Sequence, residues 1–164
     1  MMRTGTPLRL SGAAAVAGGT LRIANTVTWR IFDSHTNALL YLATDALLLL
    51  GLIGWYAARA RSLGAAGVAG FVSGVAGILV VRSAGLFPGY GYSAGSVLLL
   101  AGLVVMTSPI VLRRDGPLTT PLLWAGSLAS AVLSVLFAPL AVLAAILFGA
   151  GFICAGLGLA KSGS

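Results

Sequence analysis

The chain alternates between long apolar stretches and short breaks that contain charged residues, glycine or proline. A helix that crosses the hydrocarbon core of a membrane, about 30 Å thick, needs about 20 mostly apolar residues. This criterion predicts an all-α bundle of six transmembrane spans in a single domain. The predicted spans are 8–32, 37–58, 63–86, 93–112, 119–136 and 139–160. The break before Pro139 is the weakest, and a bundle of five spans is the alternative.

The composition agrees with a membrane protein. Of 164 residues, 59% are hydrophobic and 8% are charged, whereas a soluble domain carries about 25% charged residues. Ten basic and three acidic side chains are too few to cover a soluble globular surface. Disordered chains are poor in apolar residues, so disorder is excluded too. We therefore expect an integral membrane protein.

The basic residues predict an orientation, because cytoplasmic loops of membrane proteins carry an excess of Lys and Arg. With six spans, both termini and the second and fourth loops share one side. That side carries Arg3, Arg9, Arg59, Arg61, Arg113, Arg114 and Lys161. The opposite side carries Arg30 and Arg82. We expect both termini in the cytoplasm and, as the location, the plasma membrane of a prokaryote.

Small residues recur at helical spacing in three of the predicted spans. They are Gly67, Gly70, Gly74 and Gly77; then Gly126, Ser130 and Ser134; and finally Gly149 and Gly156. Small residues let helix backbones approach closely in lipid, where no hydrophobic driving force brings helices together. We expect these stripes to pack inside the chain rather than to form a dimer seam.

Two opposite charges lie inside the first two predicted spans. Burying Arg or Asp at the bilayer centre costs about 2.5–3.5 kcal/mol on insertion scales. Arg22 lies about 15 Å and Asp45 about 12 Å from the outer ends of their spans, at 1.5 Å per residue. The short connection makes these helices antiparallel neighbours, and the sequence therefore predicts that Arg22 and Asp45 pair.

Further polar and aromatic side chains are predicted to surround this pair near the outer face. Asn37, Tyr41 and Asp45 repeat every four residues and share one helix face. The full predicted binding site consists of Arg22, Asn25, Trp29, Asn37, Tyr41, Asp45, Arg82, Tyr90 and Tyr92. Tyr90 and Tyr92 are predicted to lie in a glycine-rich loop that could fold over the site.

In one interpretation the Arg22–Asp45 pair is structural and fixes the helix register, with the tyrosines, Trp29 and Arg30 as anchors at the membrane interface. If the cluster is instead functional, three functions fit it. In the first, which we favour, the chain is a subunit of a membrane complex or a homo-oligomer, and the polar site lies between its first three helices. In the second, the site binds or transports a small polar or anionic solute. In the third, Asp45 is the general acid or base of an intramembrane enzyme, assisted by Tyr41 and Arg22, which acts on an amphipathic substrate. Enzyme activity is not favoured.

Several kinds of chemistry are excluded by the residue counts. The single cysteine, Cys154, rules out an internal disulfide or a CxxC pair, and the single histidine rules out paired axial haem ligands. We expect no metal site and no cofactor. The expected partners are the lipid bilayer, a protein partner or second copy, and a small polar or amphipathic ligand. The orientation explains the basic charge, so nucleic acid is not expected.

Overall fold

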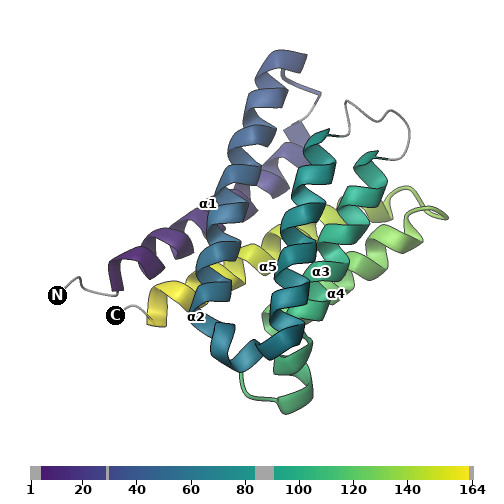
Figure 1. Cartoon of the computed structure of the whole chain (residues 1–164). Coiled ribbons are helices and arrows are strands. Elements are labelled where there is room, and N and C mark those ends of the chain that lie inside the picture. The colour runs from purple at the N-terminus through teal and green to yellow at the C-terminus, as the bar shows by residue number, and fades with distance from the viewer. Residues whose placement is uncertain (1–4, 29, 84–90, 163–164) are drawn as a thin grey trace. The chain divides into compact units, whose positions relative to one another are not determined.

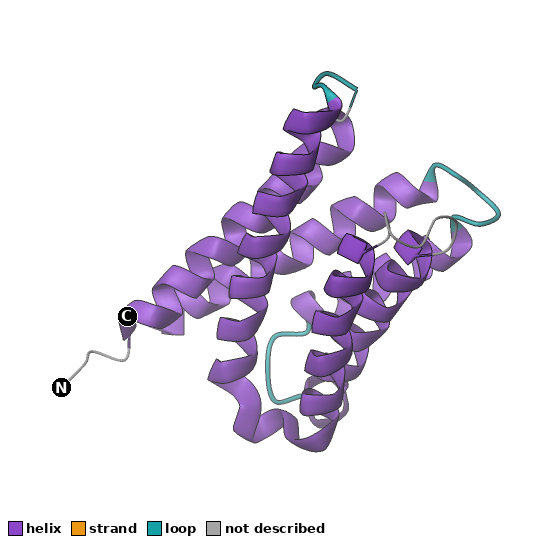
Figure 2. Ribbon diagram, turned by 45° about the horizontal axis from the view of Figure 1, so that its top comes forward, coloured by secondary structure: helices purple, strands orange, loops and turns teal. Residues whose placement is uncertain are grey.

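The computed structural model describes residues 5–28, 30–83 and 91–162. Within these ranges the chain forms five helices and no strand (Figures 1 and 2). The helices are α1 (Gly5–Thr28), α2 (Ser34–Ser83), α3 (Gly91–Arg113), α4 (Thr119–Leu133) and α5 (Leu140–Ser162). The all-α prediction is therefore confirmed for the described part of the chain.

Three of these helices, α2, α3 and α5, are long and apolar enough to cross a membrane. They support a membrane location. α4 has 15 residues, and at 1.5 Å per residue it is about 22 Å long, shorter than the hydrocarbon core. Six crossings therefore stay a prediction.

The break within α2 lies at Gly64. The sequence predicted a break at residues 59–62, which is wrong, because the chain is helical through Leu63. Gly64 has φ 59° and ψ −151°, a backbone conformation that glycine adopts readily because it lacks a Cβ atom. The segments 34–63 and 65–83 are about 45 and 28 Å long at helical rise.

The junction between α1 and α2 also differs from the prediction. α1 ends at Thr28 rather than residue 32, and α2 begins at Ser34 rather than residue 37. The cause is a cap. The Asp33 carboxylate accepts hydrogen bonds from the backbone N–H groups of His35 and Thr36, both at 2.9 Å. An aspartate in this position satisfies the first N–H groups of a helix and fixes where it starts.

The described helices belong to two compact units. The first contains residues 1–59 and 145–164, and therefore α1, the beginning of α2 and most of α5. The second contains residues 60–144, and therefore the rest of α2, α3, α4 and the start of α5. Each unit has its own close helix contacts.

In the first unit, glycines let α1 and α5 approach each other. A Cβ atom added at Gly12 would lie 2.8 Å from the Gly156 carbonyl oxygen, and one at Gly149 would lie 2.6 Å from that of Gly19. Real Cβ atoms essentially never approach a neighbour within 3.0 Å. Both helices repeat glycine after seven residues, and the pairing order shows that they run antiparallel. Packing of the Gly149 and Gly156 stripe inside the chain is confirmed.

In the second unit, the glycine stripe of α2 packs on α3. A Cβ atom at Gly102 would lie 2.5 Å from the Gly74 backbone nitrogen and 2.7 Å from the Gly70 carbonyl oxygen. A Cβ atom at Gly77 would lie 2.6 Å from the Leu99 Cα atom. The paired residue numbers fall along one helix as they rise along the other, so this pair is antiparallel. Three of the four predicted stripe glycines thus contact a neighbouring helix of the same chain.

The remaining small residues have other surroundings. A Cβ atom at Gly67 would meet the Leu63 side chain rather than α3. On α4, the Ser127 hydroxyl donates a hydrogen bond of 2.7 Å to the carbonyl oxygen of Ala144, at the start of α5. Ser130 of the predicted α4 stripe is buried. Ser127 and Ser130 therefore lie inside the second unit, whereas Gly126 and Ser134 of the predicted stripe are half-buried.

Candidate functional site

The site residues of the first unit lie along the contact between α1 and α2, which we call the α1–α2 seam. A Cβ atom added at Gly51 would lie 2.6 Å from the Ala15 Cβ atom, and one at Gly18 would lie 2.9 Å from the Leu48 backbone nitrogen. Ser11 packs against Gly54 in the same way. Seam positions on α1 are three and four residues apart and so share one face. The predicted antiparallel pairing of these helices is confirmed.

A buried hydrogen bond joins the two helices. The Asn25 side-chain amide donates to the Thr44 hydroxyl oxygen at 3.1 Å, and that hydroxyl donates to the Leu40 carbonyl oxygen at 2.7 Å. Asn25 is 5% exposed and Thr44 is fully buried. Asn25 was a predicted site residue, whereas Thr44 was missed. The signal that could have found Thr44 is its position four residues before Leu48, on the face of α2 toward α1.

The register of the seam brings Arg22 level with Asp45. Arg22 lies on α1 between Gly18 and Asn25, and the α2 partners of those residues, Leu48 and Thr44, lie on either side of Asp45. Successive helix residues are 100° apart, so Asp45 lies at the edge of the seam rather than at its centre. Contact between the two charged side chains stays a prediction.

The predicted depths need a correction. Counted from the observed helix ends, Arg22 lies about 9 Å and Asp45 about 16 Å into their helices at helical rise. The sequence predicted nearly equal depths because it ended α1 too late and began α2 too late. The seam contacts, and not the helix ends, therefore set the relative level of the two residues.

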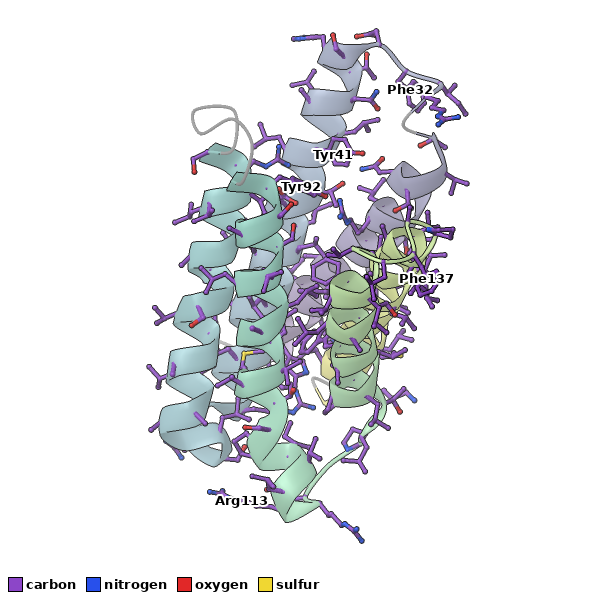
Figure 3. The ribbon with its side chains drawn as sticks, turned by 90° about the vertical axis from the view of Figure 1, so that its right-hand side faces the viewer. Phe32, Tyr41, Tyr92, Arg113 and Phe137 are labelled. Atoms are coloured by element: carbon purple, nitrogen blue, oxygen red, sulfur yellow. The ribbon has the colours of Figure 1, made fainter. Side chains whose placement is uncertain are left out.

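The polar residues near the seam differ in how far they are exposed. Arg22, Tyr41 and Asp45 are half-buried, whereas Asn25 and Thr44 are buried. Figure 3 labels Tyr41 on α2. An ionised side chain that faces acyl chains deep in a membrane costs about 2.5–3.5 kcal/mol. Arg22 and Asp45 thus each present part of a polar side chain outside the packed interior.

Asn37, another predicted site residue, supports the connection between α1 and α2. Its side-chain amide donates to the Phe32 carbonyl oxygen at 3.0 Å, and its backbone N–H donates to the Asp33 carbonyl oxygen at 3.0 Å. Hydrogen bonds from the Thr36 backbone and hydroxyl hold the pKa of the Asp33 carboxyl below its ordinary value of 3.8. These contacts stabilise the start of α2.

The other predicted residues lie in the second unit or outside the described residues. Arg82 lies in the last turn of α2 and Tyr92 in the first turn of α3, both exposed and both in the second unit. The prediction that Tyr92 lies in a loop is wrong. Trp29 and Tyr90 lie outside the described residues. The grouping of these four residues with Asp45 stays a prediction.

The described residues contain no group of three His, Cys, Asp or Glu side chains that could hold a metal ion. The chain was also compared with known proteins. No protein-family model matches it, and no curated protein or solved structure matches it significantly.

Proposed function

We propose that this chain is an integral membrane protein with six transmembrane segments and both termini in the cytoplasm. Three long apolar helices support a membrane location. The break at Gly64 supports a division of α2 into two segments. The seven basic residues expected on one side, against two on the other, support the orientation.

We further propose that the protein works as a subunit of a larger membrane assembly, either a complex or a homo-oligomer. The observation that carries this proposal is the half-buried state of Arg22 and Asp45 in the α1–α2 seam. Because charge facing acyl chains is costly, a partner chain that offers polar groups at this level lowers the energy of both residues. On this proposal the α1–α2 seam binds a partner chain in addition to holding α1 against α2.

The test compares assembly size in mild detergent, by native electrophoresis and by mass, between wild type and Asp45→Asn. We expect wild type to migrate as an assembly and Asp45→Asn to dissociate at least in part. Asp115→Asn is the matched control, because Asp115 is exposed in the loop after α3, and we expect it to leave the assembly intact. A wild type that is monomeric when extracted with its lipids would contradict the proposal.

The second candidate function is the binding of a small polar or anionic solute at the same seam. It is favoured by the same half-buried charges, since a solute can cover them as a partner chain can. A monomeric wild type, together with reaction of Asp45→Cys in a Cys154→Ser background with a water-soluble thiol reagent, would favour this function. Assembly without such reactivity would favour the subunit.

A further inference from the structure

A second feature lies far along the chain from the seam, between α3 and α4. These helices pack against each other in the second unit and leave a groove of about 260 Å³. Its walls include Val104, Val111 and Leu112 of α3 and Pro121, Leu122 and Ala125 of α4. Leu112 is 82% and Leu122 is 61% exposed, so the groove is open along one side.

The groove presents almost no hydrogen-bonding capacity along its length. The two hydroxyl residues in its wall, Thr107 and Ser108, each donate to a carbonyl oxygen of their own helix, at 2.8 Å to Leu103 and 2.8 Å to Val105. Their donors are thus used within α3. An apolar chain fits this groove better than a polar ligand.

One end of the groove is basic. Leu112 is followed by Arg113 and Arg114, where α3 ends (Figure 3). The Arg113 guanidinium donates to the Ser62 carbonyl oxygen at 3.0 Å and so is directed to α2. The Arg114 side chain is exposed, and among the described residues its guanidinium makes no hydrogen bond or ion pair. Arg114 is therefore the cation available at this end.

The first turn of α4 lies beside the same end. Leu118 precedes it and supplies no side-chain cap, so the first N–H groups of α4 have no side-chain acceptor. Thr120 is 7% exposed, and within the described ranges its hydroxyl makes no hydrogen bond. The next residue, Pro121, belongs to the groove wall. The N-terminal end of a helix favours negative charge, which adds to the charge of Arg114.

We propose that this groove binds an acyl chain of an anionic phospholipid, with the phosphate at Arg114 and the first turn of α4. The inference rests on the membrane location proposed above. The apolar walls match the acyl chain, and the cation at one end matches the phosphate. Asp115 next to Arg114 offsets part of the charge, so the preference for an anionic headgroup is moderate.

The test measures lipid retention on the full chain by native mass spectrometry, in detergent with phosphatidylglycerol or phosphatidylcholine of identical acyl chains. We expect wild type to retain phosphatidylglycerol about fivefold better, as one basic residue near a membrane surface allows. Arg114→Gln should abolish the preference and Arg114→Lys should keep it. Arg61→Gln is the matched control, because Arg61 is exposed but does not line the groove, and it should keep the preference.

A second pair of variants tests the groove itself. Ala125→Phe fills the groove and should lower retention of both lipids severalfold, whereas Ala129→Phe, at an exposed position one turn further along α4, should not. Circular dichroism checks that each variant is folded.

Equal retention of the two lipids by wild type, or equal losses in Arg114→Gln and Arg61→Gln, would overturn the inference. Complete displacement of phosphatidylglycerol by inorganic phosphate would also overturn it, because the acyl chain would then contribute nothing. Release of the chain from membranes by alkaline carbonate would contradict the proposed membrane location instead. A membrane-bound chain without lipid preference would overturn only the lipid site.

Discussion

The α1–α2 seam of the first unit and the α2–α3 contact of the second have the same geometry but different chemistry. Both are antiparallel helix pairs with small residues at three- and four-residue steps. In the second unit, Gly70, Gly74 and Gly102 bring the backbones together, and Arg113 at the end of α3 donates to the Ser62 carbonyl oxygen. In the first unit, a hydrogen bond between the buried side chains of Asn25 and Thr44 adds to the contacts of the small residues.

This difference shows that close packing in this chain does not need polar residues. Glycines bring α2 and α3 into backbone contact along their length, and dispersion contacts stabilise such a pair. Arg22 and Asp45 carry a cost in a membrane that the second unit avoids. The half-buried Arg22 and Asp45 are therefore the residues on which the proposed contact site rests, whereas Asn25 and Thr44 join the two helices.

The largest expected effect comes from disturbing a glycine contact. Gly102→Ala places a Cβ atom against backbone atoms of Gly74 and Gly70, and we expect it to lower the free energy of unfolding by about 1–3 kcal/mol. Gly158→Ala is the matched control, since a Cβ atom there meets nothing within 4 Å. Thermal unfolding in detergent measures both. Equal melting temperatures for the two variants would contradict glycine packing as the basis of the α2–α3 contact.

A smaller effect is expected for the buried hydrogen bond of the first unit. Asn25→Leu and Thr44→Val should each destabilise the protein, and a double-mutant cycle should give a coupling energy of about 0.6–1.7 kcal/mol, the range for interhelical hydrogen bonds in membranes. Asn25→Leu combined with Ser127→Ala provides the control, because Ser127 bonds to Ala144 in the second unit. If the stability losses of Asn25→Leu and Thr44→Val simply add in the double variant, this hydrogen bond contributes nothing to the stability of the protein.

The smallest effect concerns the cap of α2. The folded pKa of Asp33 is depressed, so its contribution is fully present above the unfolded pKa and is lost as the pH falls through the folded pKa. Asp33→Ala should lower the melting temperature slightly at pH 7, and the difference from wild type should shrink below about pH 4. Melting curves between pH 7 and pH 3 measure this. A constant difference over that range would argue against a carboxylate cap.

Much of the helical framework could be predicted from the sequence, because apolar length determines where a helix can cross a membrane. The breaks between helices were harder to predict from the sequence. Arg59 and Arg61 suggested a loop, but charged residues continue a helix readily, and the break lies instead at Gly64. The predicted α1–α2 junction failed because the capping role of Asp33 was not considered.

For the candidate site, the sequence correctly paired the first two helices. It missed Thr44, since a hydroxyl inside a helix gives no strong signal when it can bond to its own backbone. The lipid groove was not predictable either, because its wall residues are ordinary apolar positions whose spacing across α3 and α4 depends on tertiary packing.

A double-mutant cycle on Arg22 and Asp45 tests the central claim most directly. Arg22→Met, Asp45→Leu and the double variant are compared with wild type by thermal unfolding in detergent, with Arg22→Met and Asp33→Ala as the uncoupled pair. If the two charges lie level and interact across the α1–α2 seam, the cycle should give a coupling energy of about 1–3 kcal/mol. Effects that add to within about 0.5 kcal/mol would contradict the interaction on which the proposed site depends.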